Sequence, residues 1–166
     1  MKVPQLQIND LTNVETIYDS QIHTISIKRK EPFNCEKHDF QILDTPQKNF
    51  EVLSQIFEYL DDDQEHFIIL VFNANHTLTG YKVLFAGKMH GVYIDHAVLF
   101  RNALLLGASD IVIAHNHNQK ELKASSEDID STQRLKQSGV LLNVDIRDHI
   151  IFNRTGYISM RQQGHI

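Results

Sequence analysis

The sequence predicts a mixed α/β (α+β) fold, in which a central mixed β-sheet is sandwiched by helices. Segments whose apolar residues recur at helical spacing alternate with short, continuous apolar runs that are typical of buried strands. Turn residues join some of these runs directly, which indicates hairpins as well as helical crossovers. Hydrophobic residues make up 42% of the 166 residues, which is enough for the core of one domain.

The first 45 residues carry the weakest pattern. Ile25 and Ile27 alternate with polar neighbours, which predicts a short strand. The basic cluster 28–30 follows, and so short a cluster is more typical of a solvated edge than of a nucleic-acid contact. We expect residues 1–45 to be an N-terminal extension that packs on or flanks a domain formed by residues 46–166.

A first helix is predicted over residues 46–60. Thr45 is a suitable N-cap, and Pro46 fits the first helical turn. Apolar residues then recur at helical spacing at Phe50, Leu53, Phe57 and Leu60. The acidic run 61–63 ends the pattern.

Two strands are predicted next. Residues 67–72 form a continuous, β-prone apolar run, which indicates a fully buried central strand. Residues 73–76 are typical of a turn, and residues 78–86 are then expected to return as the antiparallel partner.

The pattern becomes helical again over residues 95–106, with Gly107 as the C-terminal stop. Residues 111–114 are apolar and β-branched, which predicts a second buried strand. This strand is expected to end at the polar stretch 115–123. Such a stretch, outside the end of a buried strand, is where ligands bind in α/β sheets.

The last third of the chain predicts a helix and then strands. The helix is expected over 126–138, ended by Gly139. Residues 141–152 indicate one or two strands, and a turn at 153–156 precedes a short strand at 157–159.

Composition excludes several classes of protein. The net charge of −5 argues against a protein that coats duplex DNA, because such binding depends on Lys and Arg neutralising phosphates. The single Cys35 excludes a disulfide framework and a Cys-rich zinc site. The N-terminal residues lack the apolar core of a signal peptide, and no run reaches the ~18–20 apolar residues of a membrane span. We therefore expect a soluble, cytoplasmic protein with no membrane partner.

Ten histidines are the unusual feature, and they prompt a search for a metal site. On an extended chain His115 and His117 point the same way, so both imidazoles can converge on one ion. A third ligand is needed, because catalytic zinc usually takes three protein ligands. Asp128 is the candidate. Ser125 and Asp128 also fit an N-terminal helix cap, and the two interpretations are compatible.

The combination of His-x-His, seven residues and Ser-x-x-Asp resembles the metal-binding signature of JAB/MPN (JAMM) metalloprotease-like domains. Residues 46–160 resemble the RadC branch of that family. The matching positions include Ala108, Ile111 to His117, Ser125-x-Glu127-Asp128-Ile129, Gly139-x-Leu141-Leu142, Asp148-His149-Ile150-Ile151 and Gly156-Tyr157-x-Ser159.

This resemblance implies a JAB/MPN (cytidine-deaminase-like) architecture and a Zn²⁺ ion held by His115, His117 and Asp128. It also implies a catalytic Glu just before the first buried strand. Glu65 occupies that place, with Asp63 as a nearby competitor. Ser125 matches the Ser that helps hold the active-site water or the developing oxyanion, although a plain helix cap stays open.

One segment departs from the RadC pattern. Where the family continues with Pro-Ser-Gly after the second His, this chain has Asn118-Gln119-Lys120. The rigid turn that presents that His is lost, which puts substrate fit and activity in question more than metal binding. Residues 1–45 also lack the glycine-centred pattern of the helix-hairpin-helix DNA-binding region that precedes this domain in full-length RadC proteins.

The resemblance therefore implies a zinc-dependent hydrolase that cleaves a peptide or isopeptide amide with an activated water. The expected partner is a peptide or protein substrate; oligomeric state is not predicted. One alternative is a catalytically weak or inactive metal-binding module that acts through partner binding, with a role in DNA repair. The acidic balance speaks against direct nucleic-acid binding. A metal nuclease, suggested by the letters His-Asn-His, lacks the ββα surroundings that it needs.

The other histidines receive ordinary interpretations. His149 lies in the apolar run 146–152, where a satisfied core or strand-edge histidine is the favoured interpretation. An orienting contact to a metal ligand is its alternative. His96 can start a helix capped by Asp95, to which we assign no chemistry.

Overall fold

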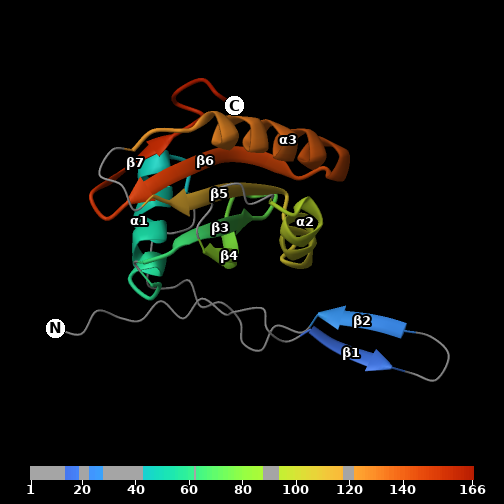
Figure 1. Cartoon of the computed structure of the whole chain (residues 1–166). Helices are drawn as coiled ribbons and strands as arrows, with labels where there is room; N and C mark the ends of the chain where they lie inside the picture. The colour runs from blue at the N-terminus through green and yellow to red at the C-terminus, as the bar shows by residue number, and fades with distance from the viewer. Residues whose placement is uncertain (1–13, 19–22, 28–42, 62, 88–93, 118–121) are drawn as a thin grey trace.

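The computed structural model describes residues 14–18, 23–27, 43–61, 63–87, 94–117 and 122–166 (Figure 1). Within these residues the helices are α1 (Pro46–Phe57), α2 (His96–Leu105) and α3 (Ser126–Leu142). The strands are β1 (Val14–Tyr18), β2 (His23–Ile27), β3 (Glu65–Phe72), β4 (Leu78–Gly87), β5 (Asp110–Asn116), β6 (Asp145–Asn153) and β7 (Gly156–Ser159). Strands β1 and β2 form an antiparallel hairpin, and β2 contains the strand expected around Ile25.

The other strands form one mixed sheet in the order β4-β3-β5-β6-β7. Strand β3 pairs antiparallel with both β4 and β5, whereas β5 and β6 are parallel and β7 returns antiparallel to β6. The parallel pair needs a crossover, and α3 supplies it. The predicted class, a mixed sheet between helical layers, is confirmed.

The two faces of the sheet carry different helices (Figure 1). Alternate residues of a strand point to opposite faces, so β3 divides between two cores. Ile68, Leu70 and Phe72 pack with α1 on one face. Phe67 and Ile69 pack with α2 and α3 on the other.

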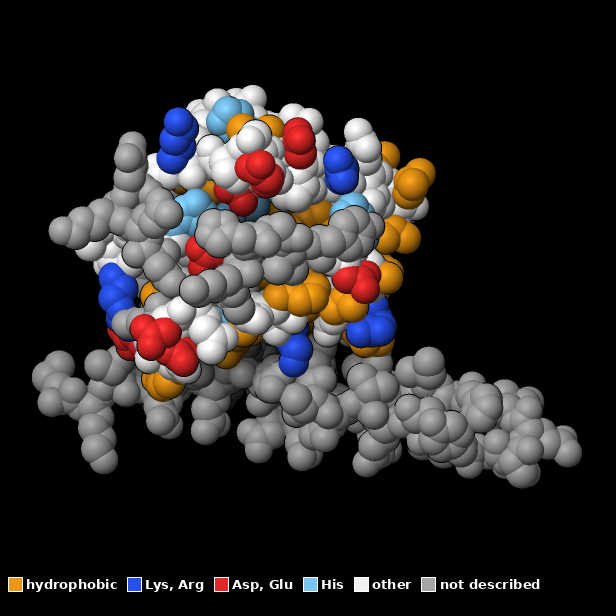
Figure 2. Space-filling model, viewed as in Figure 1, with side chains coloured by type: hydrophobic (Ala, Val, Ile, Leu, Met, Phe, Trp, Pro, Cys, Tyr) orange, Lys and Arg blue, Asp and Glu red, His pale blue; other side chains and the backbone are white. Residues whose placement is uncertain are grey.

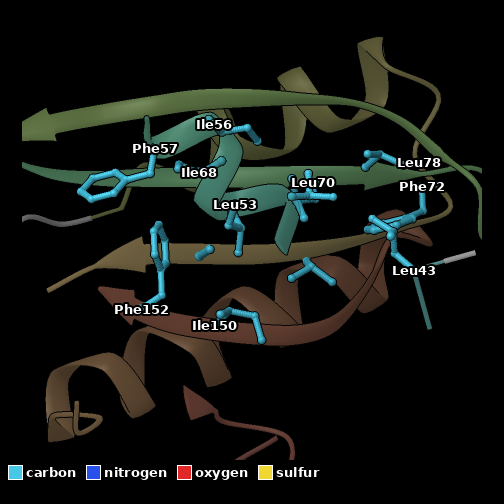
Figure 3. Close-up of a cluster of buried hydrophobic side chains, with 13 residues drawn as sticks. Leu43, Leu53, Ile56, Phe57, Ile68, Leu70, Phe72, Leu78, Ile150 and Phe152 are labelled. Carbon is cyan, nitrogen blue, oxygen red and sulfur yellow. The ribbon is translucent and has the colours of Figure 1, made fainter. Parts of the chain in front are cut away.

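Aromatic side chains build much of the core beneath α1 (Figure 3). The rings of Phe57 and Phe152 lie 5.5 Å apart at 85°, an edge-to-face contact. Phe50 contacts Phe152 and also Tyr157, whose ring centroid lies 4.9 Å away. Burying each such side chain stabilises the fold by roughly 1.5–3 kcal/mol, so this cluster anchors α1 to β6.

Helix α1 begins as predicted but ends earlier than residue 60. The Thr45 side chain accepts a hydrogen bond from the backbone of Lys48, and Pro46 opens the first turn. Glu58 is the C-cap, and the amide of Leu60 donates to the carbonyl of Phe57 in a tighter turn. Leu60 still packs on the core, which explains why it matched the helical spacing.

The predicted end of α3 at Gly139 is wrong. The helix continues to Leu142 and is capped by Asn143 in the left-handed conformation, with φ 54°. Gly139 serves packing instead, because a Cβ atom there would lie 2.4 Å from the carbonyl oxygen of Val144. The following strand consequently begins at Asp145, later than the apolar pattern suggested.

Strand β5 extends beyond its predicted end. His115 pairs with Phe67 of β3 and with Ile151 of β6, and Asn116 pairs with Phe152. The polar stretch therefore starts inside the buried strand, so the first histidine is held by backbone pairing on both sides. This extension places the site at the carboxyl end of β5.

Candidate metal centre

Three of the residues singled out in the sequence come together where β5 ends and α3 begins. His115 lies in β5, His117 is the first residue after β5, and Asp128 is in the first turn of α3. The amide of His117 donates to the carbonyl of Phe152 at 2.8 Å, which continues the strand pairing with β6 by one residue. The i, i+2 spacing thus brings both imidazoles to the α2/α3 face of the sheet.

The candidate ligand atoms are close enough for one ion. Nε2 of His115 lies 2.9 Å from Nε2 of His117 and 3.4 Å from Oδ1 of Asp128. Nε2 of His117 lies 4.0 Å from Oδ2 of Asp128. Ligand atoms of a tetrahedral zinc site are about 3.3 Å apart, given Zn–N distances of roughly 2.0–2.1 Å. In the space-filling view histidine and acidic side chains adjoin one another on the surface (Figure 2).

Burial also leaves His115 in the protonation state that can bind a metal. Burial lowers the pKa of His115 to about 4, although the Asp128 carboxylate opposes the shift. His115 is therefore neutral at pH 7 and can present a nitrogen lone pair. Imidazole nitrogens and a carboxylate oxygen are among the usual ligands of zinc, so these residues fit the ion that the resemblance implied.

Ser125 holds the Asp128 carboxylate. The backbone amide of Ser125 and its hydroxyl donate to Oδ2 of Asp128 at 2.9 and 2.6 Å, and the amide of Asp128 donates back to the Ser125 hydroxyl oxygen. The two residues form a capping box at the start of α3. Both interpretations of this pair are compatible in space, because Oδ2 serves the cap while Oδ1 faces His115.

Glu65 is the first residue of β3 and is half-buried. It shares a face of the strand with Phe67, whose ring stacks on His115 at 6.4 Å and 12°. Glu65 therefore lies on the same side of the sheet as the histidine pair. The competitor Asp63 is exposed in the preceding turn, where its amide donates to Asp61. The structure thus places Glu65, and not Asp63, on the sheet face of the two histidines.

Asn116 is a residue that the sequence analysis missed. It is fully buried and points to the sheet face opposite the two histidines. Its side-chain Nδ2 donates to the backbone carbonyl of Gln64 at 3.0 Å, and its Oδ1 accepts from the backbone amide of His66 at 2.6 Å. Asn116 therefore holds the backbone on both sides of Glu65. The predicted strand ended at residue 114, so no local signal placed Asn116 inside a buried strand.

His149 contacts the candidate ligand His115 directly. Its Nε2 lies 2.8 Å from Nδ1 of His115, and its Nδ1 lies 2.6 Å from the hydroxyl of Thr132. The structure thus favours the orienting contact over the ordinary core histidine for this residue. Thr132 is one of the positions that match the RadC pattern, but the sequence analysis assigned it no role. The departing segment Asn118-Gln119-Lys120 lies outside the described residues.

A five-stranded mixed sheet with helices on both faces, and a His-x-His pair facing an Asp at a helix start, define a domain of the JAB/MPN class. The family model described as "RadC-like JAB domain" matches residues 43–165. The chain belongs to this family. The division between an extension and a domain at residue 45 stays a prediction.

Relatives with UPF0758 names occur across bacteria. One from Staphylococcus haemolyticus is 27% identical over 166 residues, which covers 99% of this chain and 72% of that protein. One from Aquifex aeolicus is 34% identical over 119 residues, covering 72% of this chain and 50% of the relative. One from Clostridium botulinum is 32% identical, covering 75% and 54%. The chain thus spans about half the length of most relatives that it matches.

Family membership associates the chain with the metal-associated hydrolases of the JAB/MPN class. Among the described residues, no helix is both long enough and apolar enough to cross a membrane.

Proposed function

We propose that this protein is a zinc-dependent hydrolase of the JAMM type that cleaves a peptide or isopeptide amide. The observation that carries the proposal is the convergence of His115, His117 and Asp128 within 4.8 Å at the end of a buried strand. His115, His117 and Asp128 would hold the ion. When bound, zinc supplies Lewis acidity to a substrate carbonyl and lowers the pKa of water.

Glu65 would act as general base and then as general acid. Its carboxylate would take the proton from the attacking water and pass it to the leaving amine. Its place on the sheet face of His115 supports this role, as does the clamp that Asn116 forms on the neighbouring backbone. A carboxylate held on a strand keeps a fixed distance from the reacting atoms, which efficient proton transfer requires.

Ser125 would serve the site in two ways. Its hydroxyl donates to Asp128, and this bond orients the carboxylate toward the histidines. To stabilise a developing oxyanion, the same hydroxyl would turn its proton from Asp128 to the substrate oxygen. Loss of the hydroxyl should therefore lower turnover and also weaken the positioning of Asp128.

Metal analysis of the purified chain tests the metal part of the proposal. We expect close to one zinc per chain in the wild type and loss of zinc in His115→Ala and Asp128→Ala. His96→Ala is the matched control, since His96 contacts Ser138 and not the cluster. A wild type that carries no zinc, and whose melting temperature does not respond to added zinc, would contradict the proposal. Competition among zinc, cobalt and manganese identifies the preferred ion.

A second experiment tests the hydrolase part. Zinc-loaded wild type and Glu65→Gln would be incubated with isopeptide-linked and linear peptide libraries, and cleavage would be followed by mass spectrometry. We expect Glu65→Gln to retain zinc and to lose cleavage by about 10²–10⁴-fold, the usual contribution of a general base. Equal behaviour of the two proteins would point to the other candidate function.

That second candidate is a metal-binding module without turnover, acting through a bound partner. The replacement of the family's Pro-Ser-Gly by Asn118-Gln119-Lys120 favours it, because this segment leads into the active-site loop. The existing bond from the Ser125 hydroxyl to Asp128 also suits a purely structural metal site. A peptide or protein is the proposed partner in both cases.

A further inference from the structure

A chain of hydrogen bonds links the backbone of Asp128 to the ring of His115. The Thr132 hydroxyl donates to the carbonyl oxygen of Asp128 at 2.6 Å. The same hydroxyl oxygen lies 2.6 Å from Nδ1 of His149. Nε2 of His149 in turn lies 2.8 Å from Nδ1 of His115. The chain therefore begins at one candidate ligand and ends at another.

The position of every proton in this chain follows from its first member. A carbonyl oxygen can accept a hydrogen bond but never donate one. The 2.6 Å contact between Thr132 and Asp128 is therefore a hydrogen bond that the Thr132 hydroxyl donates. Its oxygen then accepts from Nδ1–H of His149. Nε2 of His149 carries no proton and accepts from Nδ1–H of His115. Neutral His115 is left with a lone pair on Nε2, the atom that faces His117 and Asp128.

Packing holds the chain in this geometry. His115 and His149 are 1% exposed and Thr132 is fully buried, so water does not compete for their hydrogen bonds. Phe67 stacks on His115 and meets the edge of His149 at 5.9 Å and 68°. Met160 closes the far side, with its sulfur 3.7 Å from the Thr132 hydroxyl.

We propose that Thr132 and His149 are positioning residues that hold His115 in the Nδ1–H tautomer, with its Nε2 lone pair directed at the metal position. The tautomer is a property of the metal-free protein. Its consequence for metal affinity rests on the proposed function. A merely structural role, in which the bonds only tie α3 to β6, would require no particular tautomer.

Nitrogen-15 NMR of the histidine rings in the metal-free full chain tests the tautomer. In the wild type we expect the Nδ1–H form for both His115 and His149. In Thr132→Val, Nδ1 of His149 loses its acceptor, so both rings should shift toward the Nε2–H form together, because their 2.8 Å contact holds a single proton. Thr132→Ser should keep the wild-type tautomers. His96, which contacts Ser138, is the internal control and should not change.

Zinc affinity provides the second measurement, by competition with a chelator. Loss of a residue that orients a metal-binding histidine typically weakens binding by about 10–100-fold, and we expect this for Thr132→Val. Thr132→Ser should bind like the wild type. Thermal unfolding of each variant, followed by circular dichroism, shows whether it is folded at the temperature of measurement.

An Nε2–H tautomer of His115 in the wild type would overturn the inference. So would a Thr132→Val variant that keeps both the wild-type tautomers and the wild-type zinc affinity. A wild type that binds no zinc would instead refute the proposed function, and the tautomer measurement would still decide the role of Thr132 and His149. If Thr132→Val does not fold, the same two measurements on His149→Gln, which retains an acceptor, and His149→Phe, which has none, decide it.

Discussion

Replacing Asn116 by alanine tests how the start of β3 is held beside the candidate metal ligands. The Asn116 side-chain amide bridges the carbonyl of Gln64 and the backbone amide of His66, which lie 52 and 50 residues away in the sequence. Alanine keeps the backbone of β5 but removes both bonds. The variant therefore isolates a contact that connects β3 to the segment between the two histidines.

The two lost bonds differ in cost. The amide of His66 is buried, and leaving it without its acceptor costs about 1–3 kcal/mol. Gln64 is exposed, so water can replace the donor to its carbonyl and the loss there is about 0.5–1 kcal/mol. We expect Asn116→Ala to lower the free energy of unfolding by about 1.5–4 kcal/mol in total.

Urea unfolding of the metal-free protein, followed by circular dichroism, measures this change. Asn102→Ala is the matched control, because Asn102 makes a bond of 2.7 Å to Val98 within its own helix. Alanine favours helix there, so the control should change stability by less than about 0.5 kcal/mol. A loss of stability in Asn116→Ala no larger than that of the control would refute the reasoning about the buried bridge.

Three further predictions concern packing and pH. Gly139→Ala should lower stability by about 1–2 kcal/mol in urea unfolding although alanine favours helix, since its Cβ would meet Val144; equal or higher stability would contradict this. Phe152→Ala should cost about 3–5 kcal/mol by the same measurement, and a loss below 1 kcal/mol would show that the core closes over the gap. Burial holds the pKa of His115 at about 4 against 6.5 in the unfolded chain, so the unfolded state binds the proton more readily. The contribution of neutral His115 to the free energy of unfolding of the metal-free protein should thus be fully present above pH 6.5 and fall by about 3 kcal/mol as the pH drops to 4. His115→Gln should lose this part of the pH dependence.

Several features of the fold and site were accessible from the sequence because their causes are local. Thr45 and Pro46 mark the start of α1 by capping chemistry, and the apolar run at 67–72 predicts a buried strand. The i, i+2 spacing of His115 and His117 puts both rings on one face of any extended chain. Asp128 was the candidate third ligand from the sequence, and the family resemblance supported that choice.

Other features depend on contacts between segments far apart in the sequence. Gly139 resembled a helix end, but the carbonyl of Val144 beyond the true cap is what excludes a side chain there. Asn116 reaches a segment about 50 residues away, and its partners are backbone groups that any sequence would offer.

The order of protons around His115 is likewise a tertiary property. Thr132 and His149 come from a helix and a strand that meet only when the parallel crossover has formed. Local periodicity records which residues share a face, so it predicted that His115 and His117 point the same way. Which lone pair each ring presents depends on hydrogen-bond partners across the core, and only the packed structure supplies them.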